Sequence, residues 1–374
     1  MTLQPTYYRK FKCIADKCKD NCCIGWEIAI DEDSYNFYQS VNNDFAKKLQ
    51  RGILKCENEY SFKLCENKRC AFLNENNLCD IICNLGENAL CQICNEHPRY
   101  YNFYKDVEEK GLGLACEEAC RIILTEEKTI NFINTENNKI CNIYTTDDIY
   151  LNFLIEVRDI LIKTLHSKSY SIYTRVAVVT RLCNIVQDMA NSSYTDIELY
   201  QSIDKLRSTA LNLLDIYKEI KTDCNNPENS FNNIIKDFMS LEVLDTKWSD
   251  LLKNTLAKIP LISLKKSTKK FGNKYDIIAE NISVYLVQRY FLEGYFNNQI
   301  NEFGIFTAIS LILITLLTGV NYSDLTQEII IDTVHNFSKE IEYSDENIEN
   351  LYYLFDKSAV YKIDNIINIL LYFI

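Results

Sequence analysis

The chain has 374 residues, 47% of them hydrophobic, and a formal net charge of −12 at pH 7. This length and apolar content suit one large domain or two smaller ones. Both parts of the chain are acidic, because residues 1–120 carry 15 basic and 19 acidic residues and the remainder carries 25 and 33. The sequence lacks the basic stripe that follows phosphates, so it predicts neither a nucleic-acid partner nor a membrane partner and favours a cationic one.

Cysteines are concentrated at the N-terminal end, where 13 of the 16 lie within the first 120 residues. Disulfide frameworks are typical of short secreted chains. This chain is long, and no apolar segment of the kind that directs secretion follows its first charges. We therefore expect a cytoplasmic protein whose N-terminal cysteines bind a metal ion or cluster. The isolated Cys141, Cys183 and Cys224 are expected to be ordinary buried thiols.

Two helices are predicted in the N-terminal third, over residues 32–50 and 116–124. Between them the chain shows no regular pattern up to about residue 100, and metal ligation would supply folding energy that few apolar residues can provide. Cys116 starts the second helix, where the helix dipole favours a thiolate. Residues 111–113, Gly-Leu-Gly, are interpreted as a turn because the charged residues 108–110 before them do not indicate a strand. No glycine-rich nucleotide-binding loop is therefore predicted.

The rest of the sequence predicts a succession of helices. The whole chain has only 9 glycines and 4 prolines, fewer than the frequent turns of a sheet-rich fold require. Apolar residues recur at helical spacing over 147–166, 172–189, 197–220, 228–242, 274–300, 303–318, 324–341, 346–357 and 359–373. The uncharged stretch 303–320 has the minimum length of a membrane span, but its polar residues and the absence of flanking basic residues favour a central buried helix.

These patterns predict a mainly α protein with two domains. An irregular, cysteine-rich domain that binds a metal or cluster would occupy residues 1–125. An all-helical domain would occupy residues 126–374 and serve as scaffold and as the surface for a protein substrate. No pattern predicts the oligomeric state.

Four blocks in the first third of the chain resemble the flagellin lysine-N-methylase family. They are FKC-x4-C-x3-CCIGWEIAID at 11–31, RCAFLNENNLCDI at 69–81, NLGENALCQICNEHPR at 84–99 and GLGLACEEACRIIL at 111–124. They occur in the family's order. A broader group, described as a zinc- or iron-chelating module, shares the cysteine cluster. The helical remainder is similar to the family in length and character only.

The resemblance implies methyl transfer from S-adenosylmethionine to the ε-amines of surface lysines on flagellin. It also implies an iron–sulfur cluster, expected to contain four irons and four sulfurs, with zinc as the alternative metal. The matching cysteines, and therefore the expected ligands, are Cys13, Cys18, Cys22, Cys23, Cys70, Cys79, Cys94 and Cys116. Cys91 resembles a variant found in some members, and the family pattern does not place Cys56, Cys65, Cys83 or Cys120. The C-x3-C-x2-C triad of radical enzymes is absent, which leaves polar and radical transfer both open.

Residues 96–104 follow Cys94 closely and concentrate groups that lysine methylation needs. Aromatic faces stabilise cations, and a base must accept the proton of an ammonium whose reference pKa is about 10.4. We expect Arg99 and Tyr101 to bind the donor, with Arg99 on its carboxylate, and Tyr100 or Tyr101 to line the lysine channel. Glu117 is the candidate base, so the candidate catalytic residues are Arg99, Tyr100 and Glu117. Structural roles for Arg99 and the tyrosines remain the alternative.

Trp26 and His97 carry less specific expectations. Trp26 is expected to pack over the cluster, and His97 to have a structural or pocket role rather than to ligate metal. The alternative functions are a non-enzymatic zinc- or iron-binding or delivery protein and a redox carrier. The long helical domain favours a protein substrate over electron transfer, for which the cysteine-rich domain would be enough.

Overall fold

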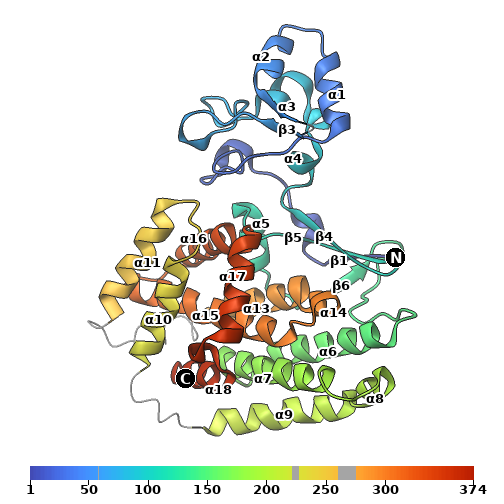
Figure 1. Cartoon of the computed structure of the whole chain (residues 1–374), viewed down its shortest axis with the longest axis vertical. Helices are drawn as coiled ribbons and strands as arrows, with labels where there is room; N and C mark the ends of the chain where they lie inside the picture. Colours follow the sequence, from blue (N-terminus) through green and yellow to red (C-terminus); the bar gives the residue numbers. More distant parts are fainter. Residues whose placement is uncertain (58, 221–226, 260–274) are drawn as a thin grey trace.

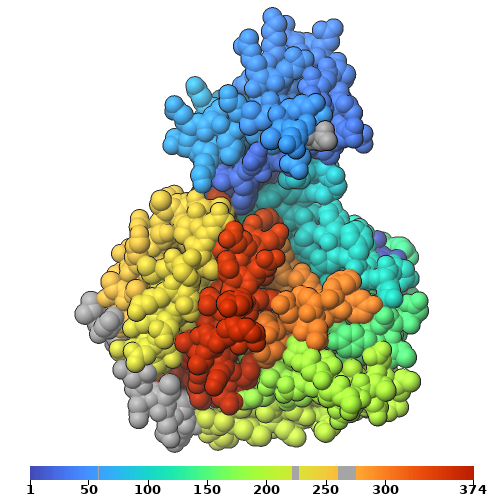
Figure 2. Space-filling view, in the orientation of Figure 1, coloured from blue at the N-terminus to red at the C-terminus, as the bar shows by residue number. Residues whose placement is uncertain are grey.

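The cysteine-rich region forms a lobe on a helical body (Figure 1). The computed structural model describes residues 1–57, 59–220, 227–259 and 275–374. We call residues 13–97 the cysteine module; in the space-filling view it stands above the body (Figure 2). The helices that follow residue 148 make up most of the body. The protein is mainly helical, as predicted.

The cysteine module folds around a small apolar core that includes Tyr38, Phe62 and Phe72. Its regular elements are α1 (Glu32–Ser40), α2 (Ala46–Arg51), β2 (Ile53–Cys56), β3 (Glu59–Phe62), α3 (Asp80–Leu85) and α4 (Gln92–Glu96), with 3-10 turns at Ala15–Lys17, Glu66–Lys68 and Glu87–Ala89. The helix predicted over 32–50 is therefore two helices. They are separated where the Asn43 side chain accepts a hydrogen bond from the amide of Phe45 (3.0 Å), because asparagine competes locally with helix hydrogen bonding.

A four-stranded sheet connects the module to the body. Its strands, in spatial order, are β4 (Arg99–Tyr104), β5 (Val107–Leu112), β1 (Thr2–Pro5) and β6 (Phe132–Asn134). β5 pairs antiparallel with β4 and parallel with β1, and β1 pairs antiparallel with β6. The first residues of the chain thus form an inner strand. The region from residue 126 onward, predicted to be all-helical, contributes the edge strand β6.

The interpretation of residues 111–113 as a turn is wrong, because β5 runs through residue 112. The charged residues 108–110 do not prevent a strand, since Glu109 is buried and paired with Arg158 of α6 (Ile149–Leu165). Gly111 pairs with Tyr100 of β4 in this sheet, and the ring of Tyr100 covers it. A Cβ at that position would lie 2.4 Å from the Tyr100 ring.

Helices of the body surround one long apolar helix. The other α-helices that the structure describes from residue 117 onward are, in order, α5 (Glu117–Leu124), α6, α7 (Ile172–Ala190), α8 (Asp196–Gln201), α9 (Ile203–Glu219), α10 (Glu228–Met239), α11 (Thr246–Lys258), α13 (Asp276–Tyr290), α14 (Gly294–Asn297), α16 (Gln327–Phe337), α17 (Asp345–Lys357) and α18 (Ile363–Tyr372). Turns of 3-10 helix occur at Tyr8–Lys10, Phe291–Glu293 and Ala359–Tyr361, and a π-helical turn occurs at Ser338–Glu342.

The central helix is α15 (Ile300–Asn321), and its burial confirms the prediction for residues 303–320. Within the described ranges it is the one helix with the length and hydropathy of a membrane span, and all of its apolar window (mean hydropathy 2.3) lies inside the protein. Helix α7 approaches it closely at Gly304, where an added Cβ would lie 2.6 Å from the Cβ of Cys183. Cys183 is a buried thiol as predicted, Cys141 is only partly buried, and Cys224 lies outside the described residues.

Most of the other predicted helices are confirmed to within a few residues. The stretch 197–220 is two helices that meet at Ser202, and 274–300 contains α13 and α14, although residue 274 lies outside the described part of the chain. Helix α11 occurs where no helix is predicted, even though Trp248 and Leu252 are buried at helical spacing.

Two apolar cores organise the molecule. The buried residues of the smaller core come from 28–91, and partly buried residues from 23–94 pack against them. The larger core contains Leu3, Tyr7 and residues between Tyr104 and Phe373. β5 and α5 contribute to the larger core. The domain boundary at residue 125 stays a prediction.

Candidate functional site

The predicted cysteine ligands lie in two groups. The first belongs to the core of the module and contains Cys23, Cys70, Cys79 and Cys94, together with the variant position Cys91. Side-chain hydrogen bonds join Cys22 to Cys23 and Cys91 to Cys94. The hydrogen bond from Cys23 lowers the pKa of the Cys22 thiol, and the bond from Cys94 lowers that of Cys91. The module therefore contains two thiol pairs, each with one thiol that ionises more readily.

The second group lies where the module meets the body. Cys116, at the start of α5, is close enough to Cys13 and Cys22 to interact electrostatically, and Cys18 is similarly close to Cys116. Burial raises the pKa of Cys116 to about 11. Burial, with the neighbouring Glu117 carboxylate, raises the pKa of Cys18 to about 12. Burial thus outweighs the backbone hydrogen bonds at Ala119 and Glu118, in the first turn of α5, which lower the pKa of the Cys116 thiol.

These thiols do not form a metal site in this arrangement. Among the residues that the structure describes, no three His, Cys, Asp or Glu side chains lie together in a way that could hold a metal ion. Of the cysteines outside the family pattern, Cys56, Cys65 and Cys83 are exposed, whereas Cys120 is buried in the body. The iron–sulfur cluster and its zinc alternative rest on the thiol content of the sequence and stay predictions.

An ion-paired contact joins the cysteine loop of residues 18–23 to the body. Oδ2 of Asp20 lies 2.9 Å from Nε2 of His335, and Nζ of Lys339 donates to both Asp20 oxygens at 2.9 and 3.0 Å. Burial alone would raise the pKa of Asp20, but the hydrogen bonds from His335 and Lys339 lower it to about 2. The contact is therefore ionised on the Asp20 side at neutral pH.

Glu117, the candidate base, faces the same loop. Its Oε2 accepts hydrogen bonds from the amides of Lys19 (2.7 Å) and Asp20 (3.3 Å) and from Sγ of Cys18 (3.4 Å). These three contacts position the loop against the first turn of α5. The catalytic role of Glu117 stays a prediction.

Trp26 and His97 also pack at the junction of module and body. The Trp26 ring stacks on Tyr343, with centroids 5.9 Å apart, and its centroid lies 6.3 Å from that of His97. Nζ of Lys339 lies 5.4 Å from the centre of the Trp26 ring. Burial, with smaller effects from His335 and Arg99, lowers the pKa of His97 to about 4, so the imidazole is neutral at pH 7.

β4 directs its predicted site residues to opposite faces, because side chains alternate along a strand. The guanidinium of Arg99 lies 6.0 Å from the centre of the Tyr8 ring, and Tyr101 hydrogen bonds with the same tyrosine. Tyr100 points away from both and lines a pocket. The structure thus keeps Arg99 and Tyr101 together and separates them from Tyr100.

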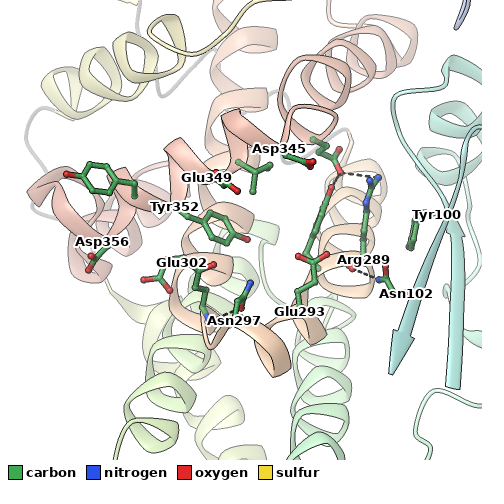
Figure 3. A pocket seen from close by; sticks show the side chains of 15 residues that line it. Tyr100, Asn102, Arg289, Glu293, Asn297, Glu302, Asp345, Glu349, Tyr352 and Asp356 are labelled. Carbon is green, nitrogen blue, oxygen red and sulfur yellow. Dashed lines mark hydrogen bonds and ion pairs between the residues drawn. The ribbon is translucent and has the colours of Figure 1, made fainter. Parts of the chain in front are cut away.

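The pocket lies between β4 and helices of the body and has a volume of about 750 Å³ (Figure 3). It is lined by Tyr100, Asn102, Arg289, Tyr290, Glu293, Asn297, Gln299, Glu302, Glu342, Asp345, Ile348, Glu349, Tyr352, Tyr353 and Asp356. Six of these residues are carboxylic acids, whereas one is a base. Figure 3 shows Glu293, Glu302 and Tyr352 around the same space.

Arg289 forms one side of the pocket and is enclosed by tyrosines. Its guanidinium carbon lies 4.8 Å from the centre of the Tyr100 ring, 5.0 Å from that of Tyr290 and 5.4 Å from that of Tyr343. Oε2 of Glu342 lies 3.6 Å from Nη1 of Arg289 and accepts a hydrogen bond from the Tyr290 hydroxyl (2.8 Å). The one cation in the lining is therefore already engaged by an anion and by aromatic faces.

The other carboxylates give the pocket an excess of negative charge. Burial raises the pKa of Glu293 to about 7, opposed by Arg289 and reinforced by Asp345. Burial also raises the pKa of Glu302. Over the part of the chain that the structure describes, no side chain donates a hydrogen bond to Glu293. A cation that entered the pocket would favour the ionised form of these partly desolvated carboxylates.

Comparison with known proteins identifies the family. Residues 158–369, more than half of the chain, match the FliB lysine N-methylase C-terminal domain. The chain belongs to this family. The family predicted from the four N-terminal blocks is thereby confirmed, from a different part of the sequence.

Relatives of the FliB family member described here come from Salmonella. Lysine-N-methylases of Salmonella typhimurium and Salmonella choleraesuis are each 30% identical over 140 residues, which are 34% of this chain and 35% of the relative. The flagellar biosynthetic protein FliU of Salmonella muenchen is 30% identical over 129 residues, 33% of this chain and 76% of that protein. This chain thus spans about a third of the length of the two methylases that it matches. No solved structure matches.

The pocket falls almost wholly within the FliB family region. All of its lining residues lie in 158–369 except Tyr100 and Asn102. Apart from Tyr100, none of the lining residues is predicted from the sequence to belong to a functional site. A signal was nevertheless present, because Asp345, Glu349 and Asp356 recur at intervals of four and seven residues, which places them on one face of a helix.

Proposed function

We propose that this chain is a lysine N-methylase that transfers methyl groups from S-adenosylmethionine to surface lysines of flagellin in the cytoplasm. Family membership supports the reaction, and the name of the FliU relative supports a flagellar substrate. The observation that carries the proposal is the carboxylate-rich pocket in the family region. The lysine ammonium group is a cation, and such a pocket attracts cations.

In a polar methyl transfer the lysine nitrogen must lose a proton before it attacks. The neutral amine then forms a bond to the methyl carbon while the bond from that carbon to sulfur breaks, and the donor leaves as a neutral thioether. The ammonium proton passes to a base whose pKa lies near the working pH. Glu293, with a pKa raised to about 7 by burial, is suited to accept it, and Glu117 is the alternative base.

We also propose that the cysteine module binds an iron–sulfur cluster. Support comes from the number of thiols and from the core shared by Cys23, Cys70, Cys79, Cys91 and Cys94. Since the described arrangement brings no three ligands together, cluster binding would require these thiols to move closer. Ligation of that kind would add to the stability of a module whose apolar core is small.

The proposal is tested with protein purified without oxygen. The protein is incubated with S-adenosylmethionine and flagellin, the mass of flagellin is followed, and iron and sulfide are measured in the same sample. Flagellin with previously acetylated lysines is the matched control. A gain of methyl groups on unmodified flagellin alone, lost when iron is removed, is expected.

Other outcomes separate the parts of the proposal. A gain of methyl groups that persists after iron removal would support the methylase function and contradict the requirement for the cluster. No gain with iron-loaded protein would support the alternative of a metal-binding or delivery protein, and zinc in place of iron would support it further.

A further inference from the structure

The pocket beside β4 is built to take a ligand and is more than a cluster of acidic residues. It encloses about 750 Å³ between secondary-structure elements that are far apart in the sequence. Glu342 lines this pocket with a fully buried side chain, yet its Oε1 has no hydrogen-bond partner. A buried polar atom without a partner is costly, so this oxygen points to a polar ligand that would satisfy it.

The chemistry of the lining selects a cation. Glu293 and Glu302 are half-buried carboxylates, and Asp345 and Glu349 are exposed at the rim. Tyr352 adds an aromatic face near Glu293 and Glu302, as Figure 3 shows. Carboxylates and aromatic faces around one space are the usual surroundings of an alkylammonium group, methylated or not.

The same lining disfavours the methyl donor. S-adenosylmethionine carries an α-carboxylate in addition to its sulfonium, and that carboxylate needs a cationic partner. Arg289, the one cation in the lining, is already paired with Glu342 and enclosed by tyrosines. A lysine within a protein has no free carboxylate, so its side chain meets attraction without repulsion.

We infer that the pocket between β4, α13, α15 and α17 binds the alkylammonium side chain of the substrate lysine and leaves the donor to a separate site. That this lysine is a substrate rests on the proposed function. The pocket's preference for an alkylammonium group can be measured without any methyl transfer.

The first test measures binding to the full-length chain by calorimetry. The probes are Nα-acetyl-lysine amide, its Nε-trimethyl form, the neutral isostere Nα-acetyl-norleucine amide, and S-adenosylmethionine. The variants are Glu293→Gln and Glu302→Gln, and the matched control is Glu346→Gln, an exposed glutamate on α17 that does not line the pocket. We expect both cationic amides to bind wild type, the norleucine amide to bind at least tenfold more weakly, and each pocket variant to lose about tenfold in affinity for the cationic amides. Glu346→Gln should bind the cationic amides as tightly as wild type does. The affinity for S-adenosylmethionine should be the same in wild type and in all three variants.

Two results would overturn the inference. Equal binding of lysine and norleucine amides would show that the pocket does not select a cation. Loss of S-adenosylmethionine binding in the pocket variants, with lysine amide unaffected, would assign the pocket to the donor instead.

Flagellin methylation by the same proteins separates this inference from the proposed function. If wild type methylates flagellin and Glu302→Gln does so with unchanged KM, the pocket assignment fails while the function stands. If wild type binds lysine amide selectively but methylates nothing, the function fails while the pocket assignment stands. A raised KM in Glu302→Gln with normal S-adenosylmethionine affinity is the result that supports both.

Discussion

Arg158 of α6 donates two hydrogen bonds to Glu109 of β5, at 2.7 and 2.6 Å, and both side chains are almost completely buried. This bidentate pair attaches the sheet to the helical body. β5 in turn pairs with β4, which carries Tyr100 into the pocket. The ion pair therefore helps to position a wall of the pocket although neither of its members lines it.

Glu109→Gln should destabilise the protein by about 3–5 kcal/mol, because it leaves the buried Arg158 guanidinium without its counter-charge. Urea unfolding measures the change. Glu59→Gln, at an exposed position on β3, is the control and should change stability by less than about 0.5 kcal/mol. A loss no larger for Glu109→Gln than for Glu59→Gln would show that the pair contributes little.

Periodicity was enough to predict most of the helices, because a helix buries a stripe that repeats every few residues. The sheet was missed for an identifiable reason. Glu109 looks like a solvent-facing residue in the sequence, and its partner Arg158 lies 49 positions away. Nothing local to β5 indicates that its charge is neutralised.

The pocket escaped prediction for a similar reason. Tyr100, Arg289 and Glu342 come from three distant segments, and only tertiary packing brings them together. The predicted residues Arg99 and Tyr101 share a strand with Tyr100 but face the other way, which is a consequence of the strand that the sequence did not reveal. The family, by contrast, could be predicted from the N-terminal blocks alone.

Glu117→Ala should release the loop of residues 18–20, because it removes the acceptor for the amides of Lys19 and Asp20. The exchange of these two amides with deuterium should become about tenfold faster, which corresponds to the loss of about 1–2 kcal/mol of local stability. Glu118→Ala, the next residue of the same helix, is the control. If exchange of the two amides is the same in both variants, Glu117 does not position the loop.

Gly304→Ala should destabilise the body by about 1–3 kcal/mol, because the added Cβ would lie 2.6 Å from Cβ and 3.2 Å from Sγ of Cys183. In an open helix the same change would be stabilising, since alanine favours helices over glycine. Thermal unfolding measures the sign directly. A higher melting temperature for Gly304→Ala would mean that α7 and α15 separate easily.

The stability contributed by Glu293 should depend on pH in the direction set by its raised pKa. The folded protein holds the Glu293 proton up to about pH 7, whereas an unfolded chain releases it near pH 4.3. The folded state thus binds more protons between these values, and stability from this group falls as the pH rises through 7. Glu293→Gln cannot ionise and escapes this loss. The unfolding free energy of Glu293→Gln minus that of wild type should therefore be larger at pH 8 than at pH 5, by on the order of 2 kcal/mol.

Urea unfolding of both proteins at pH 5 and pH 8 tests the sign, with Glu346→Gln as the control on the exposed part of α17. The quantity to compare is the difference between variant and wild type at each pH, because other groups titrate equally in both. Addition of Nα-acetyl-lysine amide should reduce the pH dependence of wild type, since a bound ammonium favours the ionised Glu293 carboxylate. If the difference in unfolding free energy between wild type and Glu293→Gln is the same at both pH values, the pKa of Glu293 is not raised in the folded protein.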